Sequence, residues 1–242
     1  DAGYWQAEVG YPYLVSVARY YGDGSEESDL NAFGPNIEFD DFGLFLWALG
    51  EWVDAGGDLS LLQPHWSDVT TLVADVLVNL IEPQTGLLAP DSSIWEVHWD
   101  GQQKHFTYSS VAGVAGLCAT ARMAQALGDD ATAQGYAAAA SALRDAIAGQ
   151  LVEPASGGLA GNLEEIAAGS AVDAAAVEAI NWGLVEPTSA LAVNTLALLE
   201  SLRIAPDRGF ARNDDLGWYD QQEWVFIDLR VAAAYAMVGE PA

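Results

Sequence analysis

Apolar residues recur every three or four positions along most of the chain, which is the spacing of one face of a helix. No segment shows the strict alternation of apolar and polar residues that is typical of a strand. Breaks containing Gly or Pro separate the periodic segments, so consecutive helices are expected to form antiparallel pairs in an all-α fold. The pattern predicts helices over residues 4–21, 39–53, 66–81, 106–127, 132–151, 172–184, 189–202 and 221–237.

The loop between the third and fourth predicted helices holds the most distinctive chemistry. Within it, Glu96 stands between Trp95 and Val97. Apolar neighbours favour the neutral form of a carboxyl group, and a neutral carboxyl can donate a proton near neutral pH. The neighbours alone leave two interpretations open, a general acid and an ordinary surface carboxylate.

The charge of the chain restricts its partners. It carries 35 acidic and 8 basic residues, only one of them a lysine, for a net charge of −27. Such a chain repels nucleic acids and anionic membranes, because binding to polyanions depends on Lys and Arg. A neutral substrate is expected, and the same acidic surface would also suit high salt. The sequence shows neither a signal segment nor an apolar run long enough to span a membrane, and it leaves the compartment open.

No metal or cofactor is predicted. His98 and His105 flank a polar spacer, but no third ligand stands at metal-binding spacing. The single Cys118 lies in an apolar run and is expected to be a buried, inert thiol.

A family resemblance decides between the two interpretations of Glu96. The segment Ile94-Trp95-Glu96, followed by a polar spacer and by His-Phe-Thr-Tyr-Ser at 105–109, resembles the central segment of glycoside hydrolase family 15. That family contains glucoamylases, glucodextranases and bacterial trehalases. The resemblance implies an (α/α)6 toroid of antiparallel helix pairs, with Glu96 as the catalytic acid and Trp95 in contact with the sugar.

Three further segments resemble this family and imply sugar-binding residues. Asp1 corresponds to the aspartate of an Arg-Asp segment, and Asp40 or Asp41 to acidic residues on the rim of the pocket. The two rim candidates would also favour the start of a helix, because carboxylates stabilise its amino-terminal end. The loop beginning at Gly209 resembles one whose arginine contacts the sugar, which indicates Arg212, with Asp214 or Asp215 beside it.

The general base is the part that the sequence does not reveal. An inverting glycosidase needs an acid and a base about 6.5–9.5 Å apart. In family 15 the base lies in a Pro-Glu-Gln-like loop near the end of the toroid, but this chain ends at Gly239-Glu-Pro-Ala without one. Glu223 is the nearest substitute. Eight predicted helices, where the toroid has twelve, also indicate that residues 1–242 form a single, partial catalytic domain.

The resemblance implies an exo-acting, inverting α-glucoside hydrolase that releases β-glucose from the ends of α-glucans. Two alternatives remain, a hydrolase of trehalose and a carbohydrate-binding or regulatory toroid without catalysis. Nine tryptophans support a sugar site, since aromatic faces stack on pyranose rings.

Overall fold

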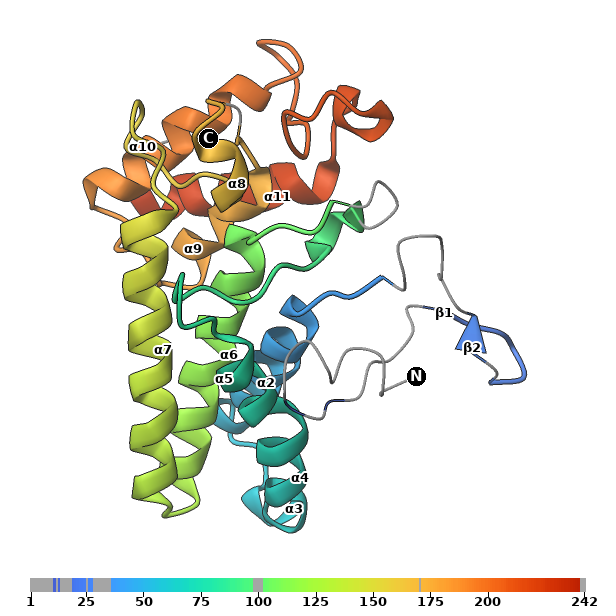
Figure 1. Cartoon of the computed structure of the whole chain (residues 1–242), viewed down its shortest axis with the longest axis vertical. Coiled ribbons are helices and arrows are strands. Elements are labelled where there is room, and N and C mark those ends of the chain that lie inside the picture. Colours follow the sequence, from blue (N-terminus) through green and yellow to red (C-terminus); the bar gives the residue numbers. More distant parts are fainter. Residues whose placement is uncertain are drawn as a thin grey trace. The chain divides into compact units, whose positions relative to one another are not determined.

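The computed structural model describes residues 11, 13, 19–24, 26–27, 36–97, 102–169 and 171–239, and these are largely helical (Figure 1). Short 3₁₀ turns occur at Gln63–His65, Ser93–Trp95, Ala174–Val177, Glu200–Leu202 and Trp218–Gln221. The helices are α2 (Asp40–Asp54), α3 (Leu59–Leu62), α4 (Trp66–Val69), α5 (Asp75–Leu80), α6 (Thr107–Ala126), α7 (Asp130–Gln150), α8 (Leu163–Ile166), α9 (Glu178–Asn181), α10 (Ala190–Leu199) and α11 (Val225–Val238).

The chain divides into two compact units. Unit 1 comprises Asp1–Lys104 and Ala112–Leu143, and unit 2 comprises His105–Val111 and Arg144–Ala242. The expectation of a single domain stays a prediction, and the two units are described separately below.

Small residues bring α2 and α6 together in unit 1. A β-carbon added to Gly43 of α2 would lie 2.3 Å from the carbonyl oxygen of Ala112, and one added to Gly116 would lie 2.7 Å from that of Gly43. Since real β-carbons never approach so closely, the two helix backbones pack at a distance that only glycine permits. Around this contact the core is aliphatic, with Leu46 and Leu117 fully buried.

The long helices α6 and α7 run antiparallel and meet at a tight turn (Figure 1). Gly128 adopts a φ of 82°, and the amide of Asp129 donates to the carbonyl of Ala124 at 2.9 Å. A left-handed glycine with this hydrogen bond is the usual end of an α-helix, which explains why Gly128 reverses the chain here.

Unit 2 packs α9, α10 and α11 around an aliphatic core that includes Ile180, Leu199 and Ile227. A partly buried ion pair reinforces it, with the Nε atom of Arg230 on α11 lying 2.8 Å from Oε1 of Glu178 on α9. No helix in the described parts of the chain is both long and apolar enough to cross a bilayer.

Most predicted helices are confirmed, with boundaries shifted by a few residues. The predicted helix at 66–81 is a continuous run of α4, a π-helical turn at Thr70–Ala74 and α5. The predicted helix at 172–184 is shorter than expected, and that at 221–237 starts later, at Val225. The small-residue segment 157–169, which lies between two predicted helices, contains the short helix α8.

The predicted helix over residues 4–21 is wrong at its carboxyl end. There β1 (Arg19–Tyr20) pairs with β2 (Glu26–Glu27) in a two-residue antiparallel ladder. The intervening turn is closed by Gly24, which has a φ of 84° and donates its amide to the carbonyl of Tyr21. Tyr and Val fit strands as well as helices, so their spacing alone misled the prediction.

Candidate functional site

Glu96 follows a short 3₁₀ turn in a backbone conformation that is rare for glutamate. Its φ and ψ are 55° and 40°, and Ser93, three residues earlier, has a φ of 50°. Trp95 and Val97 are buried on either side, while Glu96 is partly exposed. Left-handed residues other than glycine cost about 1–3 kcal/mol and cluster at functional sites. Two of them within one turn mark this loop as a candidate active-site element.

The Glu96 loop is fastened to the start of α2 through Asp91. The backbones of Asp91 and Lys104 exchange two hydrogen bonds of 3.1 Å, which close the base of the loop. The Oδ2 atom of the fully buried Asp91 accepts a hydrogen bond of 2.8 Å from the amide of Phe39, and the amide of Ser92 donates to the carbonyl of Ile37 at 2.8 Å. Asp91 therefore caps α2 from another part of the chain.

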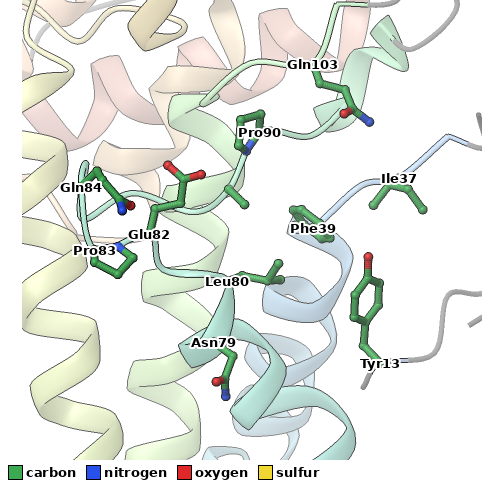
Figure 2. A pocket seen from close by; sticks show the side chains of 11 residues that line it. Tyr13, Ile37, Phe39, Asn79, Leu80, Glu82, Pro83, Gln84, Pro90 and Gln103 are labelled. Atoms are coloured by element: carbon green, nitrogen blue, oxygen red, sulfur yellow. The ribbon is translucent and has the colours of Figure 1, made fainter. Parts of the chain in front are cut away.

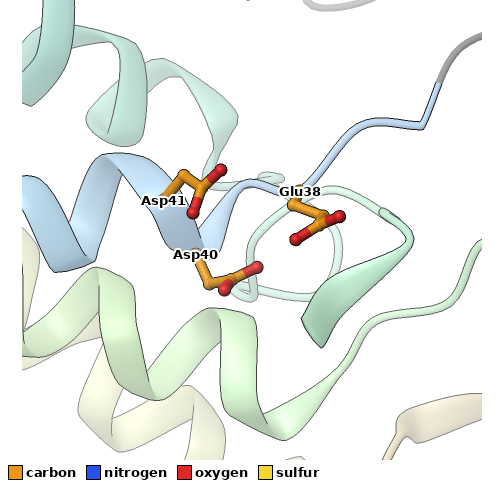
Figure 3. A group of neighbouring side chains, drawn as sticks. All are labelled: Glu38, Asp40 and Asp41. Carbon is orange, nitrogen blue, oxygen red and sulfur yellow. The ribbon is translucent and has the colours of Figure 1, made fainter. Parts of the chain in front are cut away.

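Three carboxyl groups gather at this end of α2, those of Glu38, Asp40 and Asp41, and each offers an oxygen within 4.8 Å of the others (Figure 3). Burial raises the pKa of Glu38 to about 7, and the negative charges of Asp41, Glu96 and Asp91 add to the rise. Burial, followed by the charge of Asp91, raises the pKa of Asp40 well above its ordinary value. Asp41 is exposed at its surface, but partial desolvation by neighbouring groups also raises its pKa. The cluster therefore places three carboxyl groups near Glu96 in surroundings that favour their protonated forms.

The raised pKa of Glu38 predicts a loss of stability as the pH rises. Below its ordinary value of 4.5 the group is protonated in both the folded and the unfolded chain, and its contribution is full. As the pH rises through about 7 the folded chain must release a proton that it holds more tightly than the unfolded chain. We expect the free energy of unfolding to fall between about pH 5 and pH 8, by about 2 kcal/mol more in the wild type than in Glu38→Gln.

Urea denaturation in buffer containing EDTA, at several pH values, measures this difference. Glu186→Gln is the matched control, because Glu186 is an exposed loop carboxylate. A Glu38→Gln profile as steep as that of the wild type would contradict the pKa assignment.

A cavity of about 370 Å³ opens beside the cluster in unit 1 (Figure 2). Phe39 and Tyr13 line one side, with their rings edge to face at 6.2 Å, while Glu82 and Gln84 contribute polar groups. A mixture of aromatic and hydrogen-bonding side chains is typical of pockets for small polar ligands.

In unit 2, Arg212 lies among aromatic rings. Its Nε atom donates to Oδ1 of the buried Asp220, and its guanidinium lies 5.5 Å from the ring centre of Tyr219 and 5.9 Å from that of Trp224. Trp218, 82% exposed, stacks on Tyr219 with ring centres 5.7 Å apart. The ion pair with Asp220 and the neighbouring rings therefore hold the guanidinium of Arg212 close to the exposed ring of Tyr219.

The structure distributes the predicted site residues between the two units. Asp40, Asp41, Trp95 and Glu96 belong to unit 1, where Asp40 and Trp95 are buried and Asp41 is exposed. Asp1 lies outside the described residues, as does His98.

Arg212, Asp215 and Glu223 belong to unit 2. Asp215 accepts a hydrogen bond of 3.0 Å from Asn213, and Glu223 accepts one of 3.3 Å from Arg208.

Sequence reasoning missed three acidic residues at these places, Glu38, Asp91 and Asp220. Asp91 accepts a hydrogen bond from Phe39, which is 52 residues away along the chain. Asp220 accepts one from Arg212, which is 8 residues away. Neither pair shows a sequence spacing from which the contact could be predicted. Glu38 precedes the two aspartates that were singled out, and the run of acids at the helix start was the available signal.

Comparison with solved structures supports the fold. A wild-type glycosidase is 21% identical, with a TM-score of 0.71, and two glycosidase variants are 21% and 22% identical, each with a TM-score of 0.73. Each match covers 93% of this chain but 55% of the other, so the chain spans about half the length of these glycosidases. The predicted all-α class is confirmed, and the helices are consistent with part of an (α/α)6 toroid.

Sequence comparison assigns the family. No curated protein sequence matches the chain. The sequence profile described as glycosyl hydrolases family 15 matches residues 35–225, a range that includes the Glu96 loop, the carboxyl cluster and Arg212. This chain therefore belongs to glycosyl hydrolases family 15.

Proposed function

We propose that the chain acts in an inverting, exo-acting α-glucoside hydrolase, with Glu96 as the general acid. The observation that carries this proposal is the strained turn at Glu96, in the Trp-Glu segment of a family 15 chain. Backbone strain persists only where surrounding contacts impose it, and here buried Trp95 and the Asp91 hydrogen bonds do so. A partly exposed carboxyl held in this turn is suited to protonating a glycosidic oxygen.

The remaining predicted site residues are proposed to bind sugar. Arg212 can donate paired hydrogen bonds to hydroxyls, because its guanidinium is a fixed fork of donors. The exposed ring of Trp218 offers a flat face for a pyranose next to it. In unit 1 we assign the direct contact with the sugar to Asp41, because it is exposed. Asp40 and Trp95 are buried, and we assign them a supporting position behind the sugar-binding residues.

Glu223 remains the proposed base within these residues. Its hydrogen bond with Arg208 involves an arginine side chain that is 60% exposed, and such a surface pair is worth little, so the carboxylate can leave it. Glu223→Gln should then abolish hydrolysis as completely as Glu96→Gln.

Proton NMR of the released sugar tests the proposal. The chain and Glu96→Gln are each incubated with maltotetraose, isomaltose and trehalose, and the anomer formed first is recorded. We expect β-glucose from an α-glucan, and little or none from the variant. Preference for trehalose would identify the trehalase alternative. Release of α-glucose first would contradict inversion, and no release from any substrate would favour a binding protein without catalysis.

A further inference from the structure

The carboxyl cluster at the start of α2 also provides the oxygen ligands of a cation site. We propose that Glu38, Asp40 and Asp41 bind one divalent cation of the calcium type. Figure 3 shows the carboxyl groups of Glu38 and Asp40 turned toward each other, with Asp41 on the first turn of the same helix. All three offer an oxygen within a span of 4.8 Å. The site is distinct in chemistry from proton donation by Glu96.

Two buried oxygens beside the cluster point independently to a ligand. The Oδ1 atom of Asp40 is buried and has no hydrogen-bond partner among the described residues, and Asp40 as a whole is only 2% exposed. The Oδ1 atom of Asn36 is likewise buried without a partner, while its Nδ2 atom donates to Oε1 of Glu38. A buried oxygen without a donor is costly, so each needs a compensating partner. A cation satisfies both the geometry and the charge.

The donor set favours calcium. Carboxylate and amide oxygens are hard ligands, and no His or Cys belongs to the group. Oxygens that all lie within 4.8 Å of one another are close enough to share one cation. Calcium accepts about six to eight oxygen ligands in flexible geometry, several of them carboxylates, whereas magnesium demands near-ideal octahedral geometry and usually keeps several waters. Water would supply further ligands.

Cation binding would also hold the start of α2 in place next to the Glu96 loop. Glu38 and Asp40 flank Phe39 in the sequence, and the amide of Phe39 donates a hydrogen bond to Asp91 at the base of the Glu96 loop. A cation there removes the repulsion among three carboxylates and that between the cluster and Asp91. It would thereby hold the start of α2 against the loop that carries Glu96.

Calorimetric titration of the EDTA-treated, dialysed chain with CaCl2, and separately with MgCl2, tests the site. We expect one calcium site per chain, at least tenfold weaker binding of magnesium, and at least a tenfold loss of calcium affinity in Asp40→Asn and in Glu38→Gln. Asp145→Asn removes the same charge from an exposed position on α7 and should leave the site unchanged.

The acidic surface could also bind calcium diffusely, and the control separates the two cases. Equal affinity in wild type, Asp40→Asn and Asp145→Asn would overturn the proposal, as would the absence of a stoichiometric site. Calcium should also raise the melting temperature of the wild type and of Asp145→Asn but not that of Asp40→Asn, because ligand binding stabilises only a folded site. Both readouts are independent of hydrolysis, so failure of the proposed activity would leave this test intact.

Discussion

Glu96→Gln should lower kcat for an α-glucan by about 10²–10⁴-fold, because an amide cannot donate the proton that the departing sugar oxygen requires. The change is isosteric, so the buried neighbours Trp95 and Val97 and the turn itself should be retained. The value of KM should change little, since the lost interaction belongs to the transition state. Initial rates over a range of maltotetraose concentrations measure both constants.

Glu186→Gln is the control for this comparison. Glu186 is an exposed loop carboxylate in unit 2, and its replacement should leave kcat within about twofold of the wild type. An equal loss of kcat in both variants would show that the Glu96 effect is not specific to its position.

Gly43→Ala should destabilise the chain by about 2–3 kcal/mol, because the new methyl group would overlap the backbone of α6. It would lie 2.3 Å from the carbonyl oxygen of Ala112, a backbone atom that cannot turn aside. The two helices would have to separate, which would disturb the burial of Leu46. Urea denaturation followed by circular dichroism measures the change in free energy of unfolding.

Gly135→Ala is the matched control, because it makes the same substitution in another helix, where no neighbouring atom blocks the added methyl group. Gly135 lies in the second turn of α7, is exposed, and has no atom within 4 Å of an added β-carbon. Alanine should stabilise the helix there by about 0.5–1 kcal/mol. If both substitutions changed stability equally, close packing of α2 on α6 would not be the cause.

Hydrophobic spacing predicted the long helices because burial of one face decides their formation. The segments that became α2, α6 and α7 show this most clearly, since each is long and is ended by a recognisable turn. Short elements were less predictable. The helix α8 is capped by Asn162, whose Oδ1 accepts a hydrogen bond from the amide of Glu165 at 3.0 Å. One capping residue within a segment of small residues was not enough to predict a helix there.

The candidate site was predicted only where a family motif carried it. Trp95-Glu96 and Arg212 were nominated through resemblance and stay predictions. Asp91 and Asp220, which contact these segments, act through hydrogen bonds that sequence spacing does not encode. The spacing of Glu38, Asp40 and Asp41 was visible as a run of acids, but their burial was not. Sugar binding and helix capping explained the two aspartates equally well from the sequence, which could not show that Oδ1 of Asp40 is buried without a hydrogen-bond partner among the described residues.

The central claim is that Glu96 donates a proton to the leaving group, and the most direct test changes that leaving group. Fluoride departs without protonation, whereas a sugar oxygen requires it. The ratio of kcat/KM in wild type to that in Glu96→Gln is therefore measured for α-glucosyl fluoride and for maltotetraose. A loss of about 10²–10⁴-fold with maltotetraose and of less than about tenfold with the fluoride is predicted. Equal losses with both substrates would contradict the assignment of Glu96 as the general acid.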